Sequence, residues 1–227
     1  MKIDIHTHTR KCKSGDAPTR DISAKDFCEK VLSTDVGIIA ITNHNVFDLV
    51  QYAEISTLLE GQAALAWPGI ELDIMENGAR GHLIVIVSPK SAKHFSVAVD
   101  TLTNGSTPDL FTTTIAKVLE IFEPLDPLYI AHYKQKKPAI ADDVLDILIA
   151  GTKWPERVIK EVTNSISAGI YISHGHASIY GSDIHDWAMY EEKSRDLPDL
   201  RLQVDSFEHF CLLLKKDATA INPVLDK

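Results

Sequence analysis

The sequence has little cysteine and no long apolar run. Its three cysteines, Cys12, Cys28 and Cys211, are odd in number and widely spaced, a pattern that predicts reduced thiols and excludes a disulfide framework. No apolar run approaches the length of a membrane span, and the first residues lack the apolar core of a signal peptide. We therefore expect a cytoplasmic protein with no membrane partner.

An excess of basic residues is missing as well. The chain has 23 Lys and Arg against 32 Asp and Glu, which gives a formal net charge of -9. This charge argues against a nucleic-acid-binding surface over the whole protein, although a local basic patch stays open. A length of 227 residues and a hydrophobic content of 44% suit one substantial globular domain, within the range of an α/β barrel. We expect a single domain over residues 1–227.

The first eight residues are where chemistry-bearing side chains first gather. In a strand, Ile3 and Ile5 lie on one face, whereas Asp4, His6 and His8 lie on the other. Two histidines at i and i+2 can bind one metal ion, and Asp4 is near enough to orient a ring. A solvated terminal strand or a tag remnant can carry the same pattern. Residues further along the chain are therefore needed to distinguish these alternatives from a metal site.

The same theme recurs along the chain, where apolar strands end at residues of metal-binding types. Strands are expected at 37–44, 63–72, 82–88, 128–132, 168–174 and 178–185. Helices are expected at 24–32, 47–59, 141–149, 155–162 and 207–214, and most of 90–122 is expected to be helical. This alternation of buried strands and amphipathic helices favours a largely parallel sheet.

The interval between Glu71 and His82 predicts a hairpin. Only ten residues separate them, and Asn77-Gly78 lies near the middle, whereas a parallel crossover usually needs about a dozen residues or more. With Asn77-Gly78 as the turn, Asp73 faces His82 and Glu71 lies diagonally on the same face. The second strand therefore returns His82 to the end that carries Glu71.

These strand ends converge if the sheet closes into a (β/α) barrel, whose active site lies at the C-terminal ends of the strands. The helix at 207–214 then covers the barrel. The residues that converge are His6, His8, His44, Glu71, His82, His132, Asp183 and His185. Packed without metal, several of them would be buried and unpaired, at about a few kcal/mol each. We therefore predict a metal centre.

The segments that carry these residues resemble, in order, the motifs of the polymerase and histidinol phosphatase (PHP) superfamily. They are Asp4-Ile-His-Thr-His-Thr9, Ile41-Thr-Asn-His44, Pro68-Gly-Ile-Glu71, His82, Ala131-His132 and Gly181-Ser-Asp-Ile-His185. The resemblance implies a distorted (β/α)7 TIM-like barrel of the α/β class, with the metal site at the C-terminal strand ends. It also implies two to three divalent ions (zinc, manganese or iron) and hydrolysis of phosphoric esters.

The resemblance further implies a role for each residue. The ligands implied for a first ion are His6, His8, Glu71 and Asp183. Those implied for a second ion are Glu71, His82 and His132, with Glu71 shared. A third ion is held by His44 and His185 and by a side chain from the loop after the first strand. We assign Glu71 and Asp183 to catalysis.

Two positions depart from the pattern of the superfamily. Asn43 stands before His44 where Asp is usual, but its carbonyl can still accept a hydrogen bond. In the loop after the first strand, Ser14 stands where some members have His. We assign Asp16 as the substitute ligand of the third ion, although a turn-forming role beside Gly15 fits that residue nearly as well.

The expected chemistry follows from charge. Two ions a few ångströms apart lower the pKa of a shared water and give a hydroxide nucleophile at neutral pH. Basic loops beside the strand ends can neutralise phosphate oxygens as charge builds up in the transition state. The loop residues are Arg10, Lys11, Lys13, Lys134, Lys136 and Lys137. We assign Arg10, Lys11 and Lys134 to substrate binding, with solvated loop charges as the plain alternative for any one of them.

The function that we predict is metal-dependent hydrolysis of a phosphomonoester of a small metabolite or nucleotide. The first alternative is a nuclease or phosphodiesterase on DNA or RNA, for which Tyr133 is the one obvious stacking residue. The second is a non-catalytic, metal-bound module that serves a protein partner. Of the other histidines, His94 and His209 lie on expected helices away from the strand ends, and His174 and His176 follow an expected strand.

Overall fold

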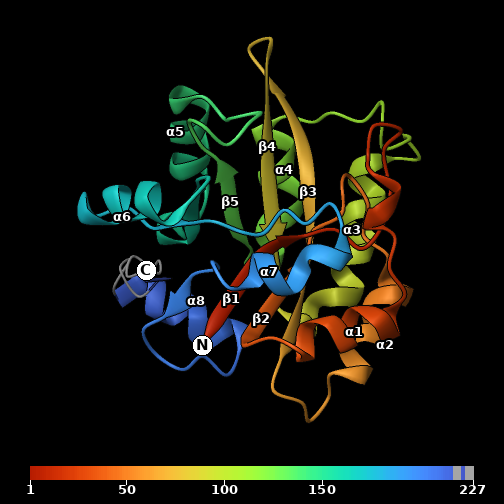
Figure 1. Cartoon of the computed structure of the whole chain (residues 1–227). Helices are drawn as coiled ribbons and strands as arrows, with labels where there is room; N and C mark the ends of the chain where they lie inside the picture. The colour runs from red at the N-terminus through yellow and green to blue at the C-terminus, as the bar shows by residue number, and fades with distance from the viewer. Residues whose placement is uncertain (217–220, 223–227) are drawn as a thin grey trace.

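A computed structural model of the chain describes residues 1–216 and 221–222, and its strands form one curled sheet (Figure 1). The strand order is β7-β6-β5-β4-β3-β2-β1-β8-β9. The strands are β1 Lys2–Thr7, β2 Val36–Ile41, β3 Leu65–Glu76, β4 Ala79–Ile86, β5 Leu128–His132, β6 Val158–Glu161, β7 Ser178–Ile179, β8 Asp199–Leu200 and β9 Ile221–Asn222. Neighbouring strands are parallel from β1 to β3 and from β5 to β7, whereas β4 is antiparallel to both β3 and β5.

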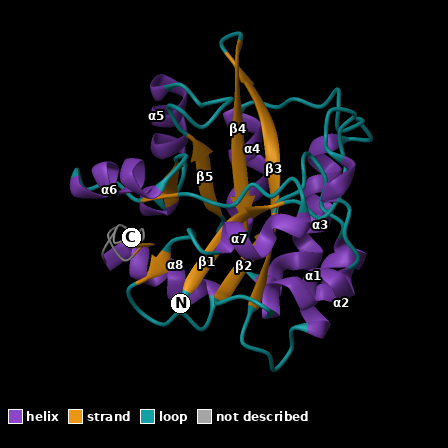
Figure 2. Cartoon of the chain, viewed as in Figure 1, coloured by secondary structure: helices purple, strands orange, loops and turns teal. Residues whose placement is uncertain are grey.

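Helices flank this sheet, with α1, α2 and α3 on one side and α5 and α6 on the other (Figure 2). They are α1 Ala24–Leu32, α2 Leu49–Leu58, α3 Ala92–Thr103, α4 Ile115–Phe122, α5 Asp142–Gly151, α6 Ser165–Ser173, α7 Tyr190–Ser194 and α8 Phe207–Lys216. Polar side chains that accept a backbone N–H bond begin four of them: Ser23, Asp48, Thr114 and Asn164. Among the described residues, no helix is both long and apolar enough to cross a membrane. The architecture is α/β and barrel-like.

The inner face of the sheet is apolar at one end and polar at the other. At the apolar end, Ile84 and Ile130 pack in one cluster with Phe207 of α8, so α8 covers this end as expected. His82 is two residues before Ile84 and His132 is two residues after Ile130, and alternation puts both histidines on the same face. The polar end of the inner face therefore continues the core of the barrel.

Strand β1 has an irregular register that changes the direction of the His6 side chain. Asp4 pairs with Ile39 and Thr7 pairs with Ile41, so β1 has one more residue in this interval, as in a β-bulge. Ile5 lies in the inner apolar cluster, and His6 turns to the polar end of the inner face, 2.9 Å from Glu161. The expectation that Asp4 shares a face with His6 is wrong, because the extra residue breaks the alternation.

The segment that follows β7 lies against β1. The Ser182 N–H donates to Asp4 Oδ1 and the Asp183 N–H donates to the carbonyl of His6, each at 2.9 Å. Gly181 allows this approach, since a Cβ there would be 2.6 Å from the Cβ of His6. The strand expected at 178–185 ends at Ile179, and Asp183 reaches the site from a loop with φ of 44°.

Several sequence expectations are confirmed. The hairpin of β3 and β4 turns at Asn77-Gly78, and Asp73 pairs with His82. The helix at 24–32 has the expected bounds, and α8 covers the helix expected at 207–214. His94 and His209 lie on α3 and α8.

Two expected elements are wrong. Residues 155–162 were expected to be helical but form a short 3₁₀ turn, Pro155–Arg157, followed by β6. Residues 168–174 were expected to form a strand but belong to α6, which Asn164 caps and which buries Ala168 and Ile172 one turn apart. The tertiary contacts of these short segments override their local propensity.

The close approach of Gly181 to β1 yields a stability prediction. Gly181→Ala should lower the free energy of unfolding by about 1–3 kcal/mol, because the added methyl group meets the strand that carries His6. Chemical denaturation measures the change. Gly15→Ala is the matched control, since nothing lies within 4 Å of its added Cβ, and equal stability of the two variants would contradict the assigned packing.

Candidate metal centre

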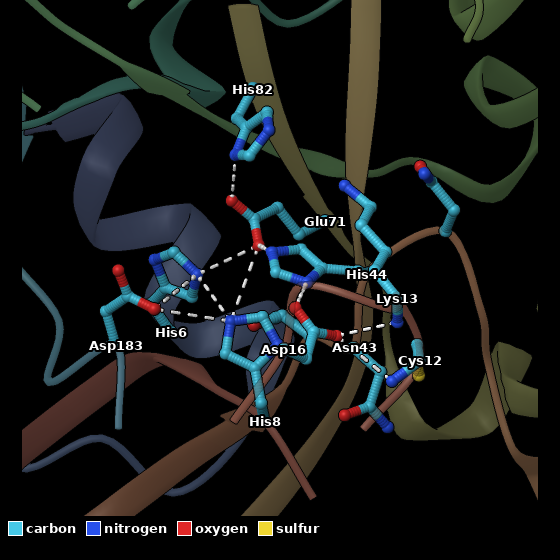
Figure 3. Close-up of polar contacts among 12 residues, drawn as sticks. His6, His8, Cys12, Lys13, Asp16, Asn43, His44, Glu71, His82 and Asp183 are labelled. Carbon is cyan, nitrogen blue, oxygen red and sulfur yellow. Dashed lines mark hydrogen bonds and ion pairs between the residues drawn. The ribbon is translucent and has the colours of Figure 1, made fainter. Parts of the chain in front are cut away.

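A buried cluster of histidines and carboxylates lies at the polar end of the inner face (Figure 3). Its members come from the ends of β1, β5 and β6, from within β3 and the antiparallel strand β4, and from the loops after β2 and β7. They are His6, His8, His44, Glu71, His82, His132, Glu161 and Asp183. The structure thus brings together seven of the eight residues singled out in the sequence and adds Glu161, whereas His185 is 61% exposed and lies outside these groups.

Four of these residues converge on one point. The Nε2 atoms of His6 and His8 are 3.1 Å apart, and they lie 3.3 and 3.4 Å from Glu71 Oε2. Asp183 Oδ1 is 3.6 Å from the first nitrogen and 3.4 Å from the second. Ligands about 2.0–2.2 Å from a shared ion are separated by distances of this size. This set has the geometry expected for the first ion.

A second set shares Glu71 through its other oxygen. Glu71 Oε1 lies 2.5 Å from His82 Nδ1 and 3.3 Å from His132 Nε2. Glu161 Oε2 lies 3.0 Å from the same nitrogen of His132. Glu71 therefore presents one carboxylate oxygen to each set, as a bridging ligand does.

Orphaned atoms test whether these sets fit metal ions. Among the described residues, Glu71 Oε2, His132 Nε2 and Glu161 Oε2 are buried and make no hydrogen bond, although they lie close to other polar atoms. Leaving each of them unpaired costs about 1–3 kcal/mol or more. Imidazole nitrogens and carboxylate oxygens are ligands that zinc, manganese and iron accept. The donor sets fit two such ions.

Glu161 is the residue of the cluster that sequence reasoning missed. Its Oε1 accepts a hydrogen bond from His6 Nδ1 at 2.9 Å, while its Oε2 faces His132. Glu161 therefore contacts the ring of His6 directly, whereas Asp4 accepts backbone N–H bonds from His6 and Ser182. The β-branched pair Val158-Ile159, two residues before Glu161, was the sequence signal for a strand that ends at a carboxylate.

Asp73 fixes the ring of His82 from outside the cluster. Asp73 Oδ1 is 2.9 Å from His82 Nε2. The carboxylate also accepts hydrogen bonds from Lys13, through Oδ2, and from Arg80, through Oδ1. Burial opposes ionisation of Asp73, but the bonds from His82, Lys13 and Arg80 hold its pKa well below the usual range. Such a carboxylate behind a histidine sets which ring nitrogen faces the ion.

The carboxylates and histidines of the cluster shift one another's pKa values. Burial disfavours the charged forms of Glu71 and Glu161, but neighbouring His6 holds the pKa of both carboxyls well below the usual value. Burial also opposes protonation of His6, yet the carboxylates of Glu161, Asp183 and Glu71 raise its pKa well above 6.5. His8 is different, since burial lowers its pKa to about 3. The cluster therefore attracts positive charge, which a divalent ion can supply in place of a proton.

The residues expected to hold a third ion surround a guanidinium instead. Arg20 NH1 lies 2.9 Å from Asp16 Oδ1 and 3.1 Å from His44 Nδ1, and its NH2 lies 3.2 Å from His185 Nδ1. Asp16 also accepts backbone N–H bonds from Cys12 and Lys13, which is the turn-forming role. With the arginine in place, this set does not fit a metal ion.

The loop cations divide into two groups. Arg10 pairs with Asp48 at 2.9 Å and Lys134 with Asp142 at 2.6 Å, on exposed surface, and Lys11 is exposed. The structure does not bring these three assigned substrate-binding residues to the cluster, because surface carboxylates hold two of them. Lys13 and Lys136 reach it instead, and Lys136 Nζ is 2.9 Å from Asp183 Oδ2.

Asn43 serves the loop that follows β1. Its Oδ1 accepts N–H bonds from Thr9 at 2.8 Å and Arg10 at 3.2 Å, and its Nδ2 donates to Thr9 Oγ1. The amide can do both, whereas a carboxylate can only accept. Asn43 thus fixes the backbone just after His8.

His174 and His176 are exposed after α6.

A groove of about 800 Å³ opens beside the cluster. Lys136, Asp183, His185, Met189 and Lys193 are among the residues that line it. Its volume falls in the range of about 300–1,000 Å³ that is typical of small-molecule sites.

No family model matches the sequence, and no curated protein matches it. Among solved structures, a protein from Bifidobacterium adolescentis assigned as a metal-dependent phosphoesterase matches with a TM-score of 0.57 and 11% identity, over 95% of this chain and 96% of that chain. An amidohydrolase from Chromobacterium violaceum, with bound sulfate and no metal, matches with a TM-score of 0.58 and 10% identity, over 82% of this chain and 88% of that chain.

A two-domain protein from Bacteroides vulgatus, containing a predicted PHP-like metal-dependent phosphoesterase, matches with a TM-score of 0.55 and 13% identity. The match covers 84% of this chain and 54% of that chain, so this chain spans about half of it. At these identities the likeness shows a shared fold. The resemblance of the motifs to the PHP superfamily is thus confirmed at the level of the fold.

The two donor sets predict the metal content of the protein and its dependence on Glu161. Untagged protein should hold about two transition-metal ions per chain. Glu161→Gln keeps the shape of the side chain but removes its charge, so metal affinity should fall about 10–100-fold. Elemental analysis after dialysis against Mn²⁺ or Zn²⁺ measures both effects. Glu60→Gln, on the exposed surface, should bind like the unaltered chain, and a metal-free wild-type protein would refute the centre.

Proposed function

We propose that the chain is a metal-dependent phosphoesterase that hydrolyses the phosphomonoester of a small metabolite or nucleotide. The observation that carries the proposal is the carboxylate of Glu71, which presents one oxygen to each of two donor sets. Divalent ions held by these donor sets would supply a Lewis acid that activates water and polarises a phosphoryl group.

The protein's own cations support a phosphate substrate. Lys136 Nζ lies 2.9 Å from Asp183 Oδ2 and 3.3 Å from Glu161 Oε1. Burial opposes the charge of Lys136, but the two carboxylates raise its pKa above the ordinary value, so it stays cationic at neutral pH. Because it lines the groove, it can donate a hydrogen bond to a phosphate oxygen as charge develops there.

Asp183 joins the groove to the cluster. Its Oδ1 faces His6 and His8, while its Oδ2 accepts from Lys136. His6 and Lys136 hold the pKa of Asp183 well below the usual range, although burial opposes its ionisation. It is therefore a carboxylate at neutral pH and can hold an ion and position Lys136 at once.

The structural neighbours support the reaction class. Two of the similar folds are assigned as metal-dependent phosphoesterases. The third, an amidohydrolase, binds sulfate, which has the tetrahedral shape of phosphate. These observations favour a phosphate ester over an amide as the substrate of this chain.

A small substrate is favoured over a nucleic acid by the distribution of charge. Arg10 and Lys134 are paired with surface carboxylates, and the groove holds Lys136 and Lys193 rather than a long basic track. Nuclease activity on DNA or RNA remains the second candidate, because the same reaction centre can act on a phosphodiester.

The bridging role of Glu71 predicts a large loss of activity in Glu71→Gln. The amide keeps the shape of the side chain but removes the charge that offsets the repulsion of two cations. Phosphatase turnover at saturating metal should fall by about two to three orders of magnitude, while circular dichroism shows a folded protein. Glu60→Gln serves as the surface control, and near wild-type turnover of Glu71→Gln would rule out the bridge.

The charge distribution predicts a preference for small substrates. A nucleotide or sugar phosphomonoester should be hydrolysed faster than single-stranded DNA or RNA, and its KM should change with salt as expected for about one or two released ions. The assay compares both substrate classes from low to physiological ionic strength with the same metal. Efficient cleavage of oligonucleotides with a steep salt dependence, beside negligible monoesterase activity, would favour the nuclease instead.

A further inference from the structure

Arg20 is a buried cation in a place where the resemblance implies a metal ion. It ends a short 3₁₀ turn, Pro18–Arg20, in the loop between β1 and α1, and it is 3% exposed. A buried arginine is uncommon unless carboxylates or other acceptors pair with it. Its position among Asp16, His44 and His185 therefore calls for a functional explanation.

The contacts of Arg20 hold its guanidinium from two sides. NH1 donates to Asp16 Oδ1 at 2.9 Å and lies 3.1 Å from His44 Nδ1. Asp16 is itself held by backbone N–H groups of the loop. The loop backbone holds Asp16, and Asp16 in turn holds the guanidinium of Arg20 in one position.

The other nitrogen of the guanidinium faces the reaction centre. Arg20 NH2 is 3.7 Å from Asp183 Oδ1, the atom that also faces His6 and His8. Its remaining neighbour is the ring of His185, which is 61% exposed at the edge of the groove. An anion that enters from the groove can therefore reach NH2 by displacing one exposed ring.

A third metal ion and this guanidinium compete for the same acceptors. Arginine keeps its proton at any physiological pH, so a divalent ion between Asp16 and His44 would lie against a permanent positive charge. His44 also turns its other nitrogen, Nε2, to within 2.7 Å of Glu71 Oε2. The geometry leaves room for two ions but not for the third.

We propose that Arg20 takes the place of a third metal ion and that its NH2 binds an oxygen of the substrate phosphate. The proposal rests on the function proposed above and specifies which group recognises the phosphate. A guanidinium matches phosphate oxygens with directed N–H bonds. Because it is part of the chain, its charge does not depend on the supply of metal.

Metal counting tests the first half of the proposal. Full-length wild-type protein is dialysed against excess Mn²⁺, and bound manganese is measured by elemental analysis. We expect about two ions per chain at saturation. Three tightly bound ions in the wild type would overturn the proposal, because the third set would then hold metal despite the arginine.

Phosphate binding tests the second half. Inorganic phosphate is titrated calorimetrically into Mn²⁺-loaded protein whose metal content has been verified. Arg20→Ala should weaken phosphate binding about tenfold or more, and Arg20→Lys, which keeps the charge but loses the fork, should weaken it by a smaller factor. Arg195→Ala removes an exposed arginine that pairs with Glu191 one helical turn away, and it should leave the affinity unchanged.

The outcomes separate this proposal from the proposed function. Unchanged phosphate affinity in Arg20→Ala or Arg20→Lys, at equal metal content and with an intact thermal transition, would show that Arg20 is only structural. Should Arg20→Ala fail to fold, Arg20→Lys decides alone. Two bound ions and Arg20-dependent phosphate binding without hydrolysis of any phosphomonoester would sustain the role of Arg20 and reject the esterase. Hydrolysis of a phosphomonoester by a protein with three bound ions would support the esterase and reject the role of Arg20.

Discussion

The buried carboxylate of Glu71 is the interaction on which the rest of the site depends. Ring nitrogens of His6, His8, His44, His82 and His132 all lie within 3.4 Å of one of its oxygens. An ionised carboxylate that is 2% exposed is expensive to bury unless positive charge and hydrogen-bond donors surround it. Segments distant in the sequence must therefore meet at Glu71, which explains why the polar end of the barrel is built from so many of them.

The same requirement accounts for the irregular features of the sheet. His82 can meet Glu71 only if β4 runs antiparallel to β3, so a hairpin interrupts the otherwise parallel strands. His6 can meet Glu71 and Glu161 only through the extra residue in β1. The function of the site thus determines where the barrel departs from regular (β/α) order.

Much of the site could be predicted from the sequence, because histidines and carboxylates at the ends of apolar strands form a local pattern. The hairpin was predictable too, since Asn77-Gly78 is a strong turn signal. Glu161 and Arg20 were not. The strand that carries Glu161 is four residues long, too short for its period to be distinguished from that of a helix. Arg20 lies in a loop, and only its tertiary contacts with Asp16 and His44 separate it from a solvated surface charge.

The balance of charge links the site to the kind of ester it suits. The carboxylates at the cluster are Asp16, Glu71, Asp73, Glu161 and Asp183, and the largely buried cations that pair with them are Lys13, Arg20 and Lys136. These carboxylates exceed these cations by two charges, and without metal the protons that the raised pKa values of His6 and His82 favour offset this excess. Two divalent ions would reverse the sign and leave an excess of two positive charges. A phosphomonoester carries up to about two negative charges at neutral pH, whereas a diester carries about one. This excess would suit the proposed monoester better than a diester, even though the chain as a whole has a net charge of -9.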